Sequence, residues 1–400
     1  MRPAVSDRLL TRCANRSGRV EVRLSCAKAH DVLSLAPQFA DDGRKADRWR
    51  RLDLRDAIRK HRGHYPIIAP VSARVFLILL GGSIAALALH VLVGSGLFSL
   101  RQVIEGFQAG PPGLTSSPEQ IVVWSLRLPR AVAAFVTGAA LATSGAALQA
   151  LFRNPLAEPY ILGISSGAAV GGVLSALLGV EAVTGIHGTF LMAFATAVLC
   201  MSLVLAFARS RFGISVQTVL IVGVTLGTFL WAVVTLLLTL QGADANRILF
   251  WLLGSFVGAD WNRVSTVGGA FLLGFVILRF FAKPLTLFAA GEETASSLGV
   301  DVERLKWGVL LTASGVAAAA VAAFGIIGFV GLFVPNLARR LTGISLSGSL
   351  PGSALLGGIA VVFADLLAQR LIPGREINVG VLTALMAAPF LLVLARRRSL

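Results

Sequence analysis

Long runs of apolar residues, separated by short polar segments, follow one another from about residue 75 to the end of the chain. A bilayer core is crossed by roughly 20 helical residues. The runs lack the alternation of a barrel strand, and a backbone inside lipid has to satisfy its own hydrogen bonds. The pattern therefore predicts an all-α, polytopic membrane protein with about ten transmembrane helices. The ten segments are Val75–Val93, Ala131–Leu151, Tyr160–Leu178, Phe190–Ala208, Val219–Leu240, Val267–Phe280, Val309–Phe324, Gly325–Leu341, Leu355–Leu371 and Val379–Leu394.

Composition excludes a soluble globular protein. Of the 400 residues, 56% are hydrophobic and 14% are charged, and the mean hydropathy is +0.79. Too little polar surface remains to cover a water-soluble domain of this size.

The first 70 residues differ from the rest of the chain. The stretch from Asp41 to Arg62 is dense in charges of both signs, and no apolar run there is long enough for a signal-peptide core. Residues 1–70 are expected to form a basic, disordered or loosely helical cytoplasmic tail held near anionic membrane lipid, and no nucleic-acid role is expected. Residues 71–400 are expected to form the transmembrane domain.

Lysine and arginine indicate the orientation of the predicted helices. When the ten segments are threaded alternately, most basic residues fall on the side of the N-terminal tail, which is cytoplasmic by the positive-inside rule. These residues are Arg153, Arg209, Arg211, Arg279, Lys283, Arg304, Lys306, Arg339, Arg340 and Arg396 to Arg398. A smaller group falls on the opposite side: Arg101, Arg127, Arg130, Arg247, Arg263, Arg370 and Arg375.

The chain carries no pattern for covalent chemistry, metal binding or nucleotide binding. Cys200 lies inside a predicted membrane helix without a second ligand at metal-binding spacing. The glycine-rich run Gly325–Gly331 lacks the Lys-Ser/Thr of a phosphate-binding loop. Asp365 is the clearest acidic residue inside the later membrane segments, so an ion-coupled secondary transporter has little chemistry to use.

Two polar connections interrupt the apolar segments. The stretch Arg153–Pro159 is charged and bounded by proline, which suggests a movable joint at a membrane surface. The stretch Lys283–Arg304 is expected to form a short helix after Gly291, to break at Gly299 and to resume toward Glu303. Two such helices would make a docking platform, and the alternative is an ordinary amphipathic surface linker.

Two other features lie on the opposite side. Arg127 and Arg130 share a helix face at its outer end if Pro129 opens the next helix. At that rim they could meet acidic groups of a partner, and the alternative is that they reach lipid headgroups. The apolar run Ala245–Gly254 is too short to span a bilayer and suggests a re-entrant helix, with Asp244 as its cap.

Five motifs in this order resemble one family, the membrane subunit of the type II ATP-driven importers for ferric siderophores, haem and vitamin B12. The resemblance covers about Val75 to Arg398. The motifs are Arg127-Leu-Pro-Arg130, Asn154-Pro-Leu-Ala-Glu-Pro159, Gly291-Glu-Glu293 with Ser297-Leu-Gly299, Gly328-Phe-Val-Gly-Leu-Phe-Val-Pro335 and Ala388-Pro-Phe390.

The resemblance implies roles for three groups of residues. Contact with the ATPase is implied for Gly291, Glu292, Glu293, Ser297, Leu298 and Gly299. A cytoplasmic gate is implied for Asn154, Leu156, Val216 and Gln217, with interfacial packing as the alternative. Docking of a binding protein is implied for Arg127 and Arg130, with Arg370 and Arg375 as candidates for a third contact, because Gln369 stands where the family often has arginine. Asn336 and Asn378 also depart from the family pattern, which has histidine and proline there.

The resemblance also implies partners. The chain would be a homodimer in the bacterial inner membrane with both termini in the cytoplasm. It would work with two copies of a separate ATPase, which bind ATP and Mg, and with one periplasmic substrate-binding protein. The chain itself would bind no cofactor or metal and would not be an enzyme. A haem, a ferric siderophore or cobalamin would be the substrate. Two alternatives remain open: an ATP-independent secondary transporter or channel, and a membrane scaffold or sensor.

Overall fold

The computed structural model describes residues 73–94, 98–113, 116–184, 186–210, 213–240, 245–343, 345–372 and 374–396. The expected tail 1–70 lies outside these residues, as do Arg211 and Asp244, so nothing is said of their structure. The described residues form helices almost throughout, which confirms the all-α fold class.

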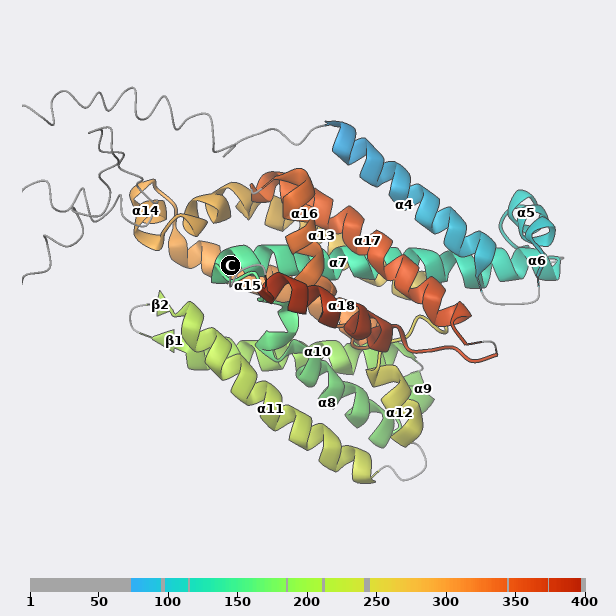
Figure 1. The fold of residues 1–400 in the computed structure, drawn as a ribbon. Helices are drawn as coiled ribbons and strands as arrows, with labels where there is room; N and C mark the ends of the chain where they lie inside the picture. Colours follow the sequence, from blue (N-terminus) through green and yellow to red (C-terminus); the bar gives the residue numbers. More distant parts are fainter. Residues whose placement is uncertain are drawn as a thin grey trace, which may run out of the picture. The chain divides into compact units, whose positions relative to one another are not determined.

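The long helices correspond to the predicted apolar runs (Figure 1). Seven helices in the described part of the chain are long and apolar enough to cross a membrane. The helices are α4 (Ala73–Val93), α5 (Leu100–Gln108), α6 (Pro118–Ile121), α7 (Leu128–Phe152), α8 (Ile164–Leu177), α9 (Val180–Thr184), α10 (Ile186–Ala208), α11 (Val216–Leu240), α12 (Ala245–Leu252), α13 (Trp261–Ala289), α14 (Glu292–Ser297), α15 (Val302–Phe324), α16 (Val330–Thr342), α17 (Leu346–Arg370) and α18 (Val379–Arg396). A π-helical turn, η2 (Val122–Arg127), joins α6 to α7, and a 3-10 turn, η3 (Pro159–Leu162), precedes α8.

Two of the ten predicted segments are too short to span the bilayer as straight helices. Helix α8 has 14 residues and α16 has 13 residues, which correspond to about 20 Å at the helical rise. Residues Gly325–Phe329 were expected to be helical, but they form a non-helical connection between α15 and α16. Gly325 (φ +74°) and Phe329 (φ +66°) adopt left-handed backbone conformations, which end the regular helix at both sides of this connection.

The helix that carries Pro129 starts earlier than predicted. The helical backbone runs without interruption from Pro118 through the π-helical turn to Phe152. A proline inside a helix removes one hydrogen bond and crowds the carbonyl one turn before it. The wider π-helical turn directly before Pro129 accommodates that crowding, so the helix continues where the sequence suggested a start.

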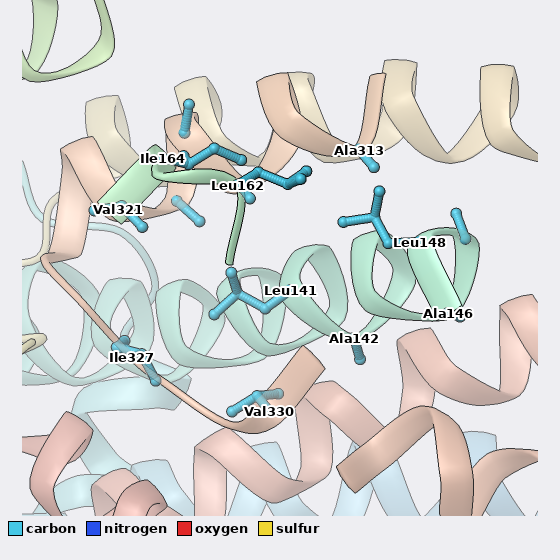
Figure 2. Packing of buried hydrophobic residues seen from close by; sticks show 14 of the residues in the cluster. Leu141, Ala142, Ala146, Leu148, Leu162, Ile164, Ala313, Val321, Ile327 and Val330 are labelled. Carbon is cyan, nitrogen blue, oxygen red and sulfur yellow. The ribbon is translucent and has the colours of Figure 1, made fainter. Parts of the chain in front are cut away.

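Helix α7 lies between other helices and is the most buried of the seven candidate spans. It contacts α17, α13, α15 and α16. Figure 2 shows Leu141, Ala142, Ala146 and Leu148 of α7 among side chains from α8, α15 and the start of α16. Small residues allow this close approach, as in other membrane helix pairs.

Helix α13 extends beyond the predicted segment. It continues through Pro284 to Ala289, so the connection starts at Ala290 rather than at Lys283. Ala282, Leu285 and Phe288 are fully buried at helical spacing. This continuous apolar face packs against the protein and stabilises the helix through the proline.

The connection between α13 and α15 contains one short helix, not two. Helix α14 begins at Glu292, as predicted, and Gly299 (φ +86°) breaks it. The resumed helix is the first turn of the long helix α15, because the Asp301 side chain accepts the backbone N–H of Arg304 at 3.1 Å and caps that helix. The short helix predicted in Ala245–Gly254 is confirmed as α12.

The glycine contact between α7 and α17 generates a stability prediction. A Cβ on Gly138 would lie 2.1 Å from the carbonyl oxygen of Gly357, so Gly138→Ala forces the two backbones apart. We expect the variant to lose about 1–3 kcal/mol of stability, measured as a lower unfolding temperature in detergent micelles. Gly269→Ala in α13 is the matched control, because its Cβ meets no atom within 4 Å. Equal unfolding temperatures for the two variants would contradict this packing.

Candidate functional site

The predicted gate and ATPase-contact residues lie at one end of the helices. This coupling end consists of α14, the loop Arg153–Pro159 and a short antiparallel hairpin of β1 (Arg209–Ser210) and β2 (Gly213–Ile214). Figure 1 shows α14 and the hairpin at this end, and α5 and α6 at the opposite end. Segments far apart in the sequence are thus brought together.

The first gate segment follows the end of α7. Arg153 ends the helix in a left-handed conformation (φ 49°), and its guanidinium carbon lies 4.5 Å from the centroid of the Phe288 ring in α13. The Asn154 side-chain oxygen accepts the backbone N–H of Leu156 at 3.0 Å, which fixes the turn. Asn154 and Leu156 are exposed. Both predicted gate side chains therefore face outward on an ordered turn.

This loop and the 3-10 turn η3 that follows it are bonded to α16 and to the connection between α15 and α16. The Asn336 side chain donates to the carbonyl oxygen of Pro155 at 2.9 Å. The Tyr160 hydroxyl donates to the carbonyl oxygen of Ile327 at 2.9 Å. Asn336, which departs from the family pattern, thus contacts the gate loop directly.

In the sequence, Glu158 lies between Pro155 and Tyr160, which make these two hydrogen bonds. Burial raises the pKa of the Glu158 carboxyl to about 7, because the charged form loses its hydration, while a hydrogen bond with the backbone of Phe329 lowers it in part. The carboxyl is therefore close to half-protonated near neutral pH. The sequence reasoning missed this residue, although its place in the Asn154–Pro159 motif was known.

The second gate segment is the start of α11. Val216 is half-buried, Gln217 is exposed, and the Ser215 carbonyl and hydroxyl oxygens accept backbone N–H groups of the first turn. The preceding residue of the hairpin, Ile214, is buried. The two gate side chains thus directly follow a segment that is fixed in the protein core.

Helix α14 exposes most of the residues predicted to contact an ATPase. Ala295 is fully buried and anchors the helix, whereas Glu293, Ser297 and Leu298 are exposed. The exposed fraction of Leu298 is 62%, which is high for an apolar side chain. Glu292 instead pairs with Lys306 of α15 at 2.7 Å. The exposed face of α14 is therefore mixed apolar and acidic.

A buried ion cluster occupies the opposite end. Asp365 of α17 is fully buried, and the Arg130 guanidinium donates to both of its oxygens at 2.8 and 2.9 Å. The His90 ring nitrogen Nε2 lies 2.7 Å from the same carboxylate, and the Gln369 amide donates to it at 2.7 Å. Arg130 also donates to the partly exposed Glu376 at 3.0 Å. Buried charges are tolerated only with such partners.

The four arginines predicted to dock a partner lie at this end but differ in exposure. Arg127 is buried and donates to the carbonyl oxygen of Val91 at 2.9 Å. Arg370 donates to the carbonyl oxygen of Val93, and Arg375 is exposed on the connection that follows α17. Arg127 and Arg130 therefore do not act as a pair on one exposed face, because one bonds the end of α4 and the other bonds Asp365.

Helix α11 carries a polar stripe that sequence reasoning missed. Thr225, Thr228, Thr235 and Thr239 are exposed and lie within about 80° of arc on the helix. Their hydroxyls donate to carbonyl oxygens one turn earlier, at 2.6–3.0 Å. The opposite face, with Gly223, packs against Ile161 and Leu162. The spacing of the threonines was visible in the sequence, but which face of the helix is covered was not.

The sequence model of the FecCD transport family matches residues 80–397. The chain is 41% identical over 70% of its length to the cobalamin import system permease protein BtuC of Halobacterium salinarum, of which it covers 74%. It is 36% identical over 69% of its length to the Fe(3+)-citrate import system permease protein YfmE of Bacillus subtilis, of which it covers 82%. A solved inward-facing ABC transporter assigned to the metal-chelate type is similar over 81% of this chain and 99% of that chain, with a TM-score of 0.70 and 31% identity.

The raised pKa of Glu158 generates a pH prediction. A carboxyl with a raised pKa stabilises the fold fully below its ordinary pKa of 4.5, and this contribution is lost as the pH rises through about 7. We expect the unfolding temperature to fall between about pH 5 and pH 8. The neutral variant Glu158→Gln should show a smaller fall, measured by thermal unfolding in micelles at several pH values. An identical pH dependence of variant and wild type would contradict the assignment.

Proposed function

We propose that this chain, which belongs to the FecCD transport family, moves a bulky chelate by alternating access, driven by a separate ATPase. The chain is the permease subunit of an ABC importer of the metal-chelate or vitamin B12 type. The arrangement of elements at the coupling end supports this proposal most directly. There the exposed short helix α14 follows α13, which contacts the first gate loop through Phe288, and α14 bonds Lys306, which contacts the hairpin before the second gate. The chain has no nucleotide-binding motif of its own.

We assign the contact with the ATPase to α14. Glu293, Ser297 and Leu298 are exposed there, and Gly291 and Gly299 bound the helix with backbone conformations that favour glycine. Two copies of the ATPase, each binding ATP and Mg, would each receive one α14 from a dimer of this chain. The coupling end and both termini would then face the cytoplasm of a bacterial inner membrane, in agreement with the distribution of basic residues.

We assign the transport pathway to the exposed face of α11. This helix is the least buried of the seven candidate spans. Its threonine hydroxyls are bonded within the helix, so the stripe offers methyl groups and acceptor oxygens rather than strong donors. Two copies facing each other across a twofold axis would enclose a wide pathway that binds no chelate tightly. Selectivity would then reside in a periplasmic binding protein.

We assign the docking of that binding protein to the end that carries the ion cluster. Arg370 and Arg375 are the best placed of the four predicted arginines, because both are exposed, whereas the Arg130 guanidinium is already paired with Asp365 and Glu376. A carboxylate of the partner would pair with either of them at the rim. Arg127 would instead support the site by bonding the end of α4.

The cargo belongs to the class of corrinoids and ferric chelates. The names of the relatives divide between cobalamin and ferric citrate. Helix α11 carries no acidic, basic, histidine, cysteine or methionine side chain, so its pathway face does not select between these cargoes. Haem and ferric siderophores remain in the same class.

Uptake by reconstituted proteoliposomes tests the proposal. Vesicles would contain this chain and its ATPase, and cyanocobalamin, haem, ferric citrate and a ferric siderophore would be offered separately with and without the binding protein. We expect uptake of one compound that requires ATP, the ATPase and the binding protein. Uptake that persists without ATP would indicate a secondary transporter or channel. No uptake of any compound would indicate a scaffold or sensor.

The exposed acid of α14 gives a sharper test of the partner. Glu293→Lys reverses a charge on the exposed face of α14 and keeps both partners of the ion pair between Glu292 and Lys306. We expect the ATPase to bind at least about tenfold more weakly, the effect of replacing an attractive interface charge with a repulsive one. Co-purification and a binding titration measure the effect. Glu119→Lys, in α6 at the opposite end, is the control, and equal ATPase binding by both variants would contradict the assignment.

A further inference from the structure

A buried lysine joins the coupling helix to the second gate. The exposed fraction of Lys306 is 5%, although it lies in the second turn of α15, near the membrane surface. Its ammonium donates to the Glu292 carboxylate of α14 at 2.7 Å and to the carbonyl oxygen of Ile214 at 3.0 Å. A buried ammonium needs such partners, because nothing else replaces its hydration.

A second contact fixes the same residue of the hairpin. Glu303, three residues before Lys306, accepts the backbone N–H of Ile214 at 2.7 Å. Both polar groups of the Ile214 backbone are therefore held by side chains of one helix. A Cβ at the neighbouring Gly213 (φ +101°) would lie 1.8 Å from the Glu303 carboxylate, so the hairpin approaches α15 closely only because glycine stands there.

These contacts form a continuous path between two sites with different assigned roles. The path starts at α14, passes through Glu292 and Lys306 to Ile214, and ends two residues later at Val216 and Gln217. Charge-assisted hydrogen bonds of this length are short and strong. A displacement of α14 is thereby transferred to the start of α11 through fixed contacts rather than through a flexible loop.

We propose that Lys306, with Glu303, is a positioning residue that transmits ATPase-driven movement of α14 to the gate at Val216 and Gln217. This inference rests on the proposed function. It assigns Lys306 no contact with the substrate or the ATPase, since its side chain is buried within this chain. Coupling of distant sites through packed, hydrogen-bonded elements is the physical basis of the transfer.

Lys306→Met tests the proposal, because methionine keeps an unbranched apolar chain but removes the ammonium. The variant would be reconstituted with the ATPase and the binding protein, using cyanocobalamin or ferric citrate as the probe, whichever the wild type takes up. We expect ATPase association and ATP hydrolysis to persist, while the amount taken up per ATP hydrolysed falls about tenfold. Lys283→Met is the matched control, since Lys283 is exposed in α13 near the same end.

The labelling rate of a cysteine at the gate tests the proposal without any transported substrate. Gln217→Cys, in a background lacking the three native cysteines, would be labelled with a maleimide with and without ATP and vanadate. We expect nucleotide to change the labelling rate in the otherwise wild-type chain and in Lys283→Met, but not in Lys306→Met. A purely stabilising role of Lys306 would leave this nucleotide response in place.

A second variant breaks the same link without changing a buried side chain, so misfolding does not explain its effect. Glu292 is half-exposed, so Glu292→Ala removes the link to α14 without opening a cavity. We expect Glu292→Ala, compared at equal amounts of bound ATPase, to show the same loss of uptake per ATP hydrolysed as Lys306→Met. Wild-type coupling in Glu292→Ala or in folded Lys306→Met would overturn the inference and leave the proposed function intact. Absence of ATP-dependent uptake in the wild type would overturn both.

Discussion

Polar groups in this chain have to find partners inside the protein, because a bilayer offers no water to replace them. This constraint explains why almost all described residues are helical. Buried charges follow the same rule, since Asp365 is surrounded by donors, whereas Lys306 and Arg127 donate to acceptor oxygens. Each buried charge therefore ties together segments that are distant in the sequence.

Each end of the helices has its own charged cluster, and the two clusters join different elements. At one end, Asp365 joins α4, α7 and α17 through His90 and Arg130, and only Glu376 reaches the surface. At the other end, Lys306 joins α14, α15 and the hairpin, while Arg153 packs on Phe288 and joins the first gate loop to α13. The first cluster ties together the helix ends at the side that we propose for docking of the binding protein. The second makes α14 and both gate segments a single connected unit.

Local sequence patterns predicted the helices, the start of α14 and the short helix α12 well, because capping residues and glycines act on their immediate neighbours. Helix limits at prolines were wrong, since Pro129 and Pro284 lie inside helices that packing and a π-helical turn sustain. The connection Gly325–Phe329 was also missed, because its contacts come from Tyr160 and α12. Lys306 was counted only among the basic residues of the cytoplasmic side, and its burial was not predicted, since its partner Ile214 is 92 residues away.

In the proposed dimer, the coupling end of each copy moves as one unit when the ATPase acts, and the two gates separate or approach. Pulsed electron-spin distances test this movement most directly, with labels at Ser297 and Gln217, which are both exposed. We expect ATP to change the distance between the Gln217 labels of the two copies but not the distance from Ser297 to Gln217 within one copy. A changed distance within one copy, or an unchanged distance between copies, would contradict it.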